Sequence, residues 1–281
     1  MDTTTADDVG DPLPVGEVGA WVREKHGYLV RYIEISRATR AKYLPPRGPG
    51  GATYIDLFCG PGKSIIRQTQ ENVDGSAIAA WRASVKSGTP FSQVYVCDSD
   101  HNNLQACVER LQRLGAPVTG YCLPASEAVV QVADDLKAKF PHGLHFAFID
   151  PFSLEALEFK LIQRLSELKR IDLLIHLSAM DLQRNLSTHL AASNTSWDGF
   201  APGWQTCIDT LGPQSEVRRR LVEYWRQKIS QLGLWPSTER RLVTGDKGQP
   251  LYWLLMAARH ALPHEFWGVA SNPEGQGALF Q

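Results

Sequence analysis

Residues 54–64 read Tyr54-Ile55-Asp56-Leu57-Phe58-Cys59-Gly60-Pro61-Gly62-Lys63-Ser64, and they give the clearest indication of the fold. An apolar run, a carboxylate and two closely spaced glycines follow one another in it. The order predicts a buried strand, a tight turn and the start of a helix. Glycine permits the positive φ angles that such a turn needs, and it lets a ligand approach the backbone because no side chain intervenes. We therefore expect a nucleotide-like ligand at this turn.

Two kinds of ligand suit such a turn. A phosphate-binding loop follows G-x-x-x-x-G-K-[ST], and Gly62, Lys63 and Ser64 supply its end, but Leu57 stands where the first glycine belongs. Asp56 opposes a triphosphate as well, whereas a carboxylate accepts hydrogen bonds from an ammonium group such as that of S-adenosylmethionine. The string from Asp56 to Gly62 resembles the first signature of class I methyltransferases. A nucleotide hydrolase and a turn that binds nothing are the alternatives.

Composition limits the classes of function. The chain has 281 residues and a mass of 31.2 kDa, enough for one large α/β domain or two small ones. With 29 basic and 30 acidic residues, its net charge of −1 predicts no global attraction to nucleic acid or to an anionic membrane. The five cysteines lack C-x-x-C spacing, so we expect reduced core residues, a cytoplasmic location and no metal site. No apolar run is long enough to suggest a membrane span or an export signal.

The elements expected near the glycine turn are mostly helical. Apolar residues recur at helical spacing between Val18 and Leu44, with basic residues such as Lys25 between them. Basic and aromatic residues of this helix would form a lid or substrate-side wall, or simply a solvated face. Residues 63–70 are expected to begin the first crossover helix, and residues 76–86 a second one.

Polar residues follow the next two predicted strands. The strand 94–97 ends in Asp98 and Ser99, where one carboxylate can accept hydrogen bonds from both vicinal hydroxyls of a ribose. The alternative is that Asp98 or Asp100 only caps the following helix. After the weaker strand 117–122, Ala125 and Ser126 are candidate contacts of an adenine edge.

Residues 144–152 form a second informative stretch. Nearly continuous apolar residues predict a strand buried on both faces, and Asp150 at its carboxyl end faces the crevice where ligands bind in open α/β sheets. Asp150-Pro151-Phe152 resembles the Asp/Asn-Pro-Pro-Tyr/Phe signature of methyltransferases that act on exocyclic amines, although one proline is missing. That resemblance implies that Asp150, Pro151 and Phe152 hold the acceptor. Methyl transfer needs alignment and at most a base, and we expect Asp150 to be that base. A magnesium ligand in a nucleotide hydrolase is the alternative for Asp150.

The last third of the chain contains an insertion and a hairpin. From Met180 to Thr206 we expect a loop-rich segment, whose amides and aromatics either line a pocket for a flat acceptor or pack at the surface. A helix with a basic face follows, and its arginines read more simply as a solvated face than as a nucleic-acid surface. The strands 171–178, 241–244 and 251–257 complete the sheet, with a turn at residues 245–248.

Several of these segments together resemble one family, the three-Cys-motif partner proteins, TcmP. They are the helix with Lys25 and Tyr32, the glycine turn, Gly75-Ser76, Phe-Ile-Asp-Pro-Phe and the late Pro250-Leu251-Tyr252-Trp253-Leu254. The resemblance runs from about Trp21 to Trp267. It implies a methyltransferase-like Rossmann domain and a partner protein with clustered cysteines and iron–sulfur or radical chemistry.

The expectations are thus an α/β protein of the Rossmann-like class I methyltransferase fold, with a seven-stranded, mostly parallel sheet, a terminal antiparallel hairpin and helices on both faces. The expected organisation is a flexible leader (1–16), one domain (17–270) with an N-terminal helical extension and an insertion around 180–235, and a tail (271–281). The expected function is methyl transfer from S-adenosylmethionine to a nucleobase-like or small-molecule acceptor. A non-catalytic partner of the three-cysteine protein is the alternative. The expected cofactor-binding residues are Asp56, Phe58, Gly60, Pro61, Gly62, Asp98, Ser99, Ala125 and Ser126.

Overall fold

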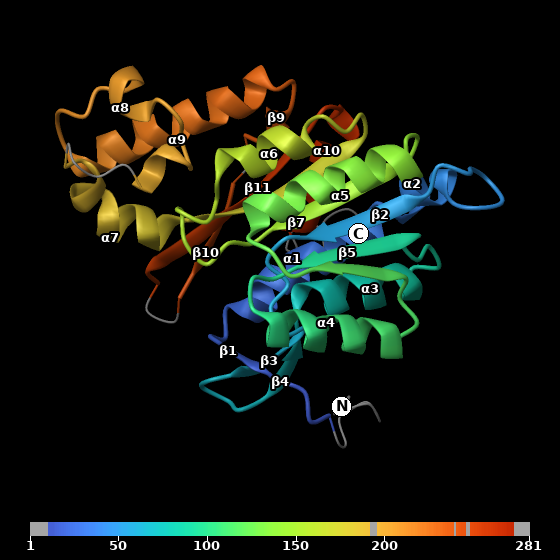
Figure 1. Cartoon of the computed structure of the whole chain (residues 1–281). Coiled ribbons are helices and arrows are strands. Elements are labelled where there is room, and N and C mark those ends of the chain that lie inside the picture. The colour runs from blue at the N-terminus through green and yellow to red at the C-terminus, as the bar shows by residue number, and fades with distance from the viewer. Residues whose placement is uncertain (1–10, 192–195, 239, 246–247, 273–281) are drawn as a thin grey trace, which may run out of the picture.

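The computed structural model describes residues 11–191, 196–238, 240–245 and 248–272. Its main element is an eight-stranded sheet (Figure 1). The strands are β2 (Ala52–Asp56), β5 (Gln93–Cys97), β6 (Val118–Tyr121), β7 (Leu144–Ile149), β8 (Ile171–Ser178), β9 (Trp235–Pro236), β10 (Arg241–Thr244) and β11 (Pro250–Ala258). Seven of them follow the order β10–β11–β8–β7–β2–β5–β6, and β9 pairs with β11. These seven are the strands that the sequence predicted.

The directions of pairing identify the sheet. Strands β6, β5, β2, β7 and β8 run parallel to one another, whereas β11 runs antiparallel to both β8 and β10. The predicted terminal antiparallel hairpin is therefore confirmed, although residues 246 and 247 of its turn lie outside the described residues. A mostly parallel sheet with one such strand and helices on both faces has the Rossmann-like architecture of class I methyltransferases, as the sequence predicted.

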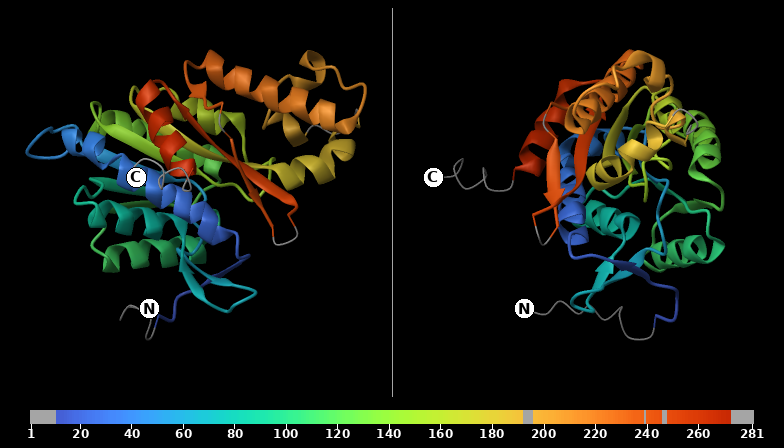
Figure 2. Two further views of the ribbon diagram at one scale, coloured as in Figure 1. Left: turned by 180° about the vertical axis from the view of Figure 1, so that it is seen from behind. Right: turned by 90° about the vertical axis from the view of Figure 1, so that its left-hand side faces the viewer.

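Two apolar cores lie on opposite faces of the sheet, because successive strand residues point to opposite sides. Ile55 and Leu173 belong to one core, and their neighbours Tyr54 and Leu174 belong to the other. The first core is covered by α5 (Ala125–Lys139), α6 (Phe159–Leu165), α7 (Ala179–His189) and α9 (Gln214–Gln231). The second is covered by α1 (Val22–Ile35), α3 (Ser76–Lys86), α4 (His101–Arg113) and α10 (Ala261–Ser271). The view from behind in Figure 2 shows α1 and α10 side by side.

A second, small sheet follows the glycine turn. It consists of β1 (Gly16–Val18), β3 (Lys63–Ile66) and β4 (Asn72–Asp74), with β3 parallel to β1 and antiparallel to β4. The crossover helix predicted over residues 63–70 is therefore wrong. A phosphate-binding loop needs a helix directly after its lysine and serine. Because Lys63 and Ser64 begin a strand instead, the structure does not form that loop.

The segment between Val18 and Leu44 is helical as expected, but it is divided. Helix α1 is followed by the short α2 (Arg37–Arg40) and by the 3-10 turn η2 (Ala41–Tyr43). The last predicted helical turn, around His264, belongs to the longer helix α10. None of the helices in the described residues is both long and apolar enough to cross a membrane.

The insertion is more helical than the sequence indicated. After α7 come η3 (Ser196–Asp198), α8 (Trp204–Cys207) and α9, which lie beyond one end of the sheet in Figure 1. The aromatics proposed as a pocket wall are buried, with exposed fractions of 1% or less for Trp197, Phe200 and Trp204. Phe200 also stacks on Trp225, with ring centroids 5.5 Å apart. These residues form the interior of the helical insertion. Of the two readings that the sequence left open, the pocket wall is therefore wrong, and the packing lies inside the insertion and not at the surface.

The expected leader is held in part against the domain. Residues 11–16 lie beside α4, where Arg110 is 7% exposed, and residues 1–10 lie outside the described residues. The Arg110 guanidinium donates hydrogen bonds to Asp11 Oδ2 (2.8 Å) and to the carbonyls of Leu13 (3.1 Å), Pro14 (2.8 Å) and Pro61 (2.5 Å). One buried side chain therefore joins the N-terminal segment to the glycine turn.

Arg110→Met is expected to lower the free energy of unfolding by about 2 kcal/mol, because it removes a buried donor that a carboxylate and three carbonyls share. Urea unfolding measures this loss. The matched control is Arg113→Met, since Arg113 also reaches Asp11 but has a side chain that is 49% exposed. The control is expected to change stability by less than about 0.5 kcal/mol. Equal losses in the two variants would contradict the role assigned to Arg110.

Candidate functional site

A crevice of about 740 Å³ lies at the carboxyl ends of β2, β5, β7 and β8. The chain passes from β2 to β5 and β6 on one side of the sheet and then returns to β7 and β8 on the other side. The strand order therefore reverses between β2 and β7. Ligands of open α/β sheets bind at such a reversal, outside the carboxyl ends of the strands. The small sheet supplies another wall, through residues 17–18 of β1 and Arg67 after β3.

Glycines shape the turn between β2 and β3 in two different ways. Gly60 and Gly62 have positive φ angles of 54° and 81°. A Cβ atom on Gly60, which borders the crevice, would meet nothing within 4 Å, so the space beside its backbone is open to a ligand. A Cβ on Gly62 would approach Cys107 at 3.2 Å, and one on Gly75 would approach Gly62 at 2.9 Å. Gly62 and Gly75 therefore allow two backbone segments to pack closely.

Asp56 has a different role from the one that the sequence suggested. Its exposed fraction is 0%, and it does not border the crevice. Oδ2 accepts hydrogen bonds from Ser76 Oγ at 2.6 Å and from the Tyr54 hydroxyl at 3.2 Å, while Oδ1 accepts one from the Phe58 N–H at 3.2 Å. Burial raises the pKa of Asp56 to about 6, against the opposing effect of these hydrogen bonds. The carboxylate thus holds the turn and α3 together, and it is not placed to receive an ammonium group directly.

Asp98 lies where the sequence predicted, at the end of β5 and at the wall of the crevice. Its Oδ2 accepts a hydrogen bond from the Gly60 N–H at 3.0 Å, and its Oδ1 accepts one from the Asp100 N–H at 2.8 Å. The capping residue of α4 is Asp100, because its side chain accepts from the N–H groups of Asn102 and Asn103. Asp98 is therefore not the helix cap.

The remaining predicted cofactor residues divide into two groups. Phe58, Ser99 and Ala125 border the crevice together with Gly60 and Asp98. Pro61, Gly62 and Ser126 do not border it. Pro61 uses its carbonyl to accept from Arg110, and Gly62 uses its carbonyl to accept from the Gly75 N–H at 2.8 Å. Together with Asp56, four of the nine predicted cofactor residues therefore do not border the crevice.

Asp150 carries an ion pair that the sequence did not reveal. Lys25 Nζ donates to Asp150 Oδ2 at 2.5 Å, and both side chains are more than four-fifths buried. Burial raises the pKa of this carboxyl, but the charge of Lys25, with a further effect of His176 when it is protonated, outweighs burial and leaves the pKa of Asp150 below its ordinary value. A carboxylate with a lowered pKa is a weak base. The structure therefore does not favour Asp150 as the general base that the sequence suggested, but it suits an ionised hydrogen-bond acceptor.

His176 lies behind Asp150, at the crevice wall. Its Nδ1 is 3.4 Å from Asp150 Oδ1 without forming a hydrogen bond, and its ring packs edge-on against Tyr252 with centroids 4.3 Å apart. Burial lowers the pKa of His176 to about 4, so the ring is neutral at pH 7. An ammonium and an imidazole thus surround Asp150. In the described residues, no three His, Cys, Asp or Glu side chains are grouped to hold a metal.

The rim of the crevice contains further residues that matter. Phe152 is 90% exposed beside Asp150 and Pro151, all three of which border the crevice as predicted. Lys25 and Trp21 reach the crevice from the N-terminal helical segment. The sequence indicated these two residues only through the basic and aromatic side chains of that segment. A substrate-side wall and a solvated face were the two interpretations of them. The structure favours the wall for these two residues.

No family model matches the sequence, and no curated protein matches it. Similarities exist among solved structures. A putative O-methyltransferase from Klebsiella pneumoniae has 12% identity, 89% coverage of this chain, 85% coverage of its own chain and a TM-score of 0.44. A cofactor-bound protein from MTB has 14% identity, 89% coverage of this chain, 85% coverage of its own chain and a TM-score of 0.45. A SAM-dependent methyltransferase from Anabaena variabilis has 12% identity, 88% coverage of this chain, 96% coverage of its own chain and a TM-score of 0.37. Likenesses this distant assign no reaction, and the fold rests on the strand order of the chain itself.

Proposed function

We propose that the protein is an S-adenosylmethionine-dependent methyltransferase that acts on a flat, nitrogen- or oxygen-containing acceptor. One observation carries this proposal. The crevice at the reversal of the strand order has the glycine turn and Asp98 on one flank and the Asp150-Pro151-Phe152 string on the other. A cofactor and an acceptor can therefore meet above the ends of β2 and β7.

The crevice residues fit this cofactor. Each oxygen of Asp98 accepts one backbone N–H and keeps a lone pair, so the carboxylate can also accept from the two hydroxyls of a ribose. Phe58 and Ala125 offer apolar surface to the adenine, and the open space beside Gly60 admits the methionine part. When bound, the cofactor supplies a methyl group on a sulfonium, which is already activated for displacement.

The contribution of the chain at the acceptor end is alignment and charge. Asp150 is ionised because Lys25 outweighs burial, so it can accept a hydrogen bond from an N–H group of the acceptor. Its negative charge also stabilises the positive charge that develops on a nitrogen during methyl transfer. The exposed ring of Phe152 offers a stacking surface to a flat acceptor. Because Asp150 is a weak base, a nitrogen acceptor suits this site better than an alcohol.

Asp98→Ala is expected to weaken S-adenosylhomocysteine binding at least tenfold, because two hydrogen bonds to a charged acceptor are lost. Isothermal titration of the purified protein measures the affinity. The matched control is Asp100→Ala, which removes the α4 cap outside the crevice. It is expected to cost about 1 kcal/mol of stability without changing the affinity. Absence of binding to the wild type, or equal affinity in wild type and Asp98→Ala, would contradict the proposed cofactor site.

A second candidate function is a non-catalytic partner of a three-cysteine protein with iron–sulfur or radical chemistry. The contact between Lys25 and Asp150 favours this candidate, because it occupies Oδ2, one of the two carboxylate oxygens that an acceptor would use. Radiolabelled S-adenosylmethionine separates the two candidates when it is incubated with the protein and a small-molecule extract. Label in a new product supports the transferase, whereas cofactor binding with no transfer to any fraction supports the partner.

A further inference from the structure

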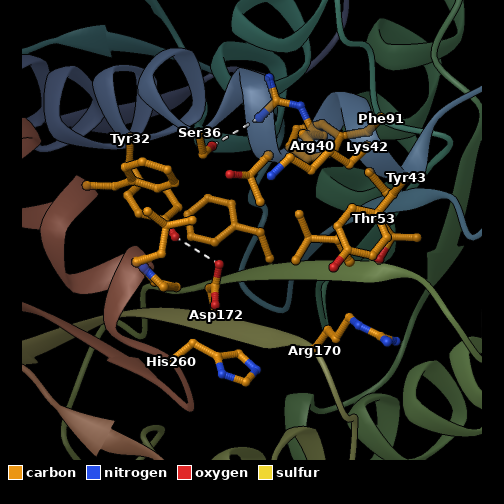
Figure 3. Close-up of a pocket in the computed structure, with 17 residues that line it drawn as sticks. Tyr32, Ser36, Arg40, Lys42, Tyr43, Thr53, Phe91, Arg170, Asp172 and His260 are labelled. Carbon is orange, nitrogen blue, oxygen red and sulfur yellow. Dashed lines mark hydrogen bonds between the residues drawn. The ribbon is translucent and has the colours of Figure 1, made fainter. Parts of the chain in front are cut away.

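A second cavity, of about 270 Å³, lies at the opposite edge of the sheet from the crevice. It borders the amino ends of β2, β7 and β8 and is closed by α1, α2, η2 and α10. Figure 3 shows its lining. Aromatic rings from four of these elements make up much of the wall, namely Tyr32, Tyr43, Phe146 and Phe266. The rings of Tyr32 and Phe146 lie 4.8 Å apart, so the wall is a packed aromatic surface.

One carboxylate faces this aromatic cavity. Asp172, near the start of β8, accepts a hydrogen bond at Oδ2 from the Tyr32 hydroxyl at 2.9 Å, as Figure 3 shows. In the described part of the chain, no basic side chain forms an ion pair with Asp172, which distinguishes it from Asp150 in the crevice. Burial raises the pKa of Asp172 to about 7, against the effect of the Tyr32 hydrogen bond. The side chain of Asp172 is half-buried at the cavity wall. A carboxylate that is partly removed from water is costly without a counter-ion, and an ion pair would offset that cost.

The nearby arginines do not supply that partner. Arg40 is 2% exposed, and all its N–H groups donate to neutral oxygens. The acceptors are the carbonyls of Thr89 and Ile33 and the hydroxyls of Ser36, Ser87 and Thr89. Arg170 lies over the ring of Tyr43, with its guanidinium carbon 5.8 Å from the centroid, and donates to the His142 carbonyl. Arg40 is thus fully engaged in the structure, and Arg170 is engaged with Tyr43 and His142.

We propose that this cavity is a second ligand site, which takes a small protonated amine with a flat apolar body. The ammonium group would donate to the free oxygen of Asp172, and the apolar body would lie between the rings of Tyr32, Phe146 and Phe266. Aromatic faces attract cations in addition to burying apolar surface. A volume of about 270 Å³ suits a ligand with a single ring. The site is independent of the cofactor crevice, because the two open at opposite edges of the sheet.

Phenethylamine and its neutral isostere 2-phenylethanol test the proposal by isothermal titration to the full-length protein. At pH 8 the amine is expected to bind at least tenfold more tightly than the alcohol. From pH 8 to pH 6 its affinity is expected to fall about tenfold as Asp172 becomes protonated, with no such change for the alcohol. The other titratable or charged groups that face the cavity are Tyr32, Arg40, Lys42, Tyr43, Arg170 and His260.

Variants make the assignment specific. Asp172→Asn is expected to remove the preference for the amine while keeping S-adenosylhomocysteine binding, which shows that the variant is folded. Tyr32→Phe removes the one donor to Asp172, so the pH midpoint of amine binding is expected to move upward. Asp134→Asn, at a side chain that is 59% exposed, is the control and should change nothing. Equal affinity for amine and alcohol, unchanged amine binding in Asp172→Asn, or displacement of the amine by S-adenosylhomocysteine would each overturn the proposal.

Discussion

Gly75→Ala is expected to destabilise the protein by about 3 kcal/mol and to abolish detectable S-adenosylhomocysteine binding. A Cβ atom at this position would lie 2.9 Å from the Cα and the carbonyl carbon of Gly62, so the backbone must move. The Gly75 N–H also donates to the Gly62 carbonyl at 2.8 Å, which fixes the end of the β3–β4 hairpin. Movement of Gly62 displaces the turn that contains Gly60, and the crevice changes shape with it. Urea unfolding measures the first effect, and isothermal titration measures the second.

Gly27→Ala is the matched control, since the same methyl group is added inside helix α1. There the new Cβ would meet only the flexible end of Arg31, at 3.4 Å. Alanine is expected to stabilise the helix by about 0.5–1 kcal/mol and to leave cofactor binding unchanged. If Gly75→Ala unfolded at the same urea concentration as the wild type and bound the cofactor analogue normally, the close contact with Gly62 would not be needed.

The sheet could be predicted from the sequence because its strands are short apolar runs that are buried on both faces. Residues 144–149 and 171–178 are nearly continuous in apolar side chains, and this pattern is rare outside a central parallel strand. The two-residue strand β9 was not predicted, because Trp235 and Pro236 form no pattern of their own. Its pairing with β11 is a tertiary contact, and local sequence does not encode such a contact.

The β3–β4 hairpin was missed for a related reason. Ile65 and Ile66 are β-branched and favour a strand, but residues 63–70 also follow a glycine turn, after which a helix is usual in this fold. Strand β3 pairs with β1, from residues 16–18, so part of its support comes from a distant segment. As a pair, Gly75-Ser76 was indicated only by the family resemblance, although Ser76 also begins the helix predicted over residues 76–86. The structure supplies its physical reason, which is the close approach to Gly62 and the hydrogen bond to Asp56.

The site could be predicted as far as strand topology determines it. Residues directly after parallel strands meet at one edge of the sheet, and Asp98 and Asp150 both border the crevice for this reason. Sequence does not determine the direction of a side chain within a turn, and Asp56 points into the protein. It also does not determine which cation pairs with Asp150, because Lys25 lies 125 residues away along the chain.

Asp172→Asn is expected to raise the free energy of unfolding at pH 8 by about 3 kcal/mol and to change it little near pH 4. Asp172 lies between the buried residues Ile171 and Leu173 at the start of β8. In the described residues, its carboxyl accepts a hydrogen bond from Tyr32 and forms no ion pair with a cation. An amide keeps the shape and the hydrogen-bonding oxygen without the charge. Most core substitutions destabilise a protein, so a gain of this size would be an unusual result with one specific cause.

The sign follows from proton linkage. In the unfolded chain this carboxyl titrates near its ordinary value of about 4, whereas burial raises its pKa in the folded protein to about 7. Between these values the folded state binds more protons than the unfolded state, so the stability of the wild type falls as pH rises. The loss begins near pH 4 and is complete above pH 7. Asparagine does not titrate, and the difference between variant and wild type therefore grows across this interval.

The prediction concerns the difference in the free energy of unfolding between Asp172→Asn and the wild type, because other groups titrate in the same pH interval. Burial raises the pKa of Asp56 to about 6, so Asp56, like Asp172, makes the protein less stable as pH rises. His26, His145 and His176 act in the opposite direction, since burial lowers the pKa of each to about 4 and the folded state then binds fewer protons. Both proteins contain these four groups, so their effects cancel in the subtraction. Urea unfolding at several values between pH 4.5 and pH 8 gives the two curves.

Two results would show whether the carboxylate of Asp172 only destabilises the folded protein or also binds an amine in the aromatic cavity. A pH-independent difference between Asp172→Asn and wild type would mean that the carboxyl of Asp172 is not perturbed in the folded protein. If the difference grows as expected, saturating phenethylamine at pH 8 should reduce it, because a bound ammonium supplies the missing counter-ion to the wild type but not to the variant. A difference that grows with pH but ignores the amine would assign the cost to burial alone. The same unfolding curves thus test the carboxylate and its proposed ligand independently.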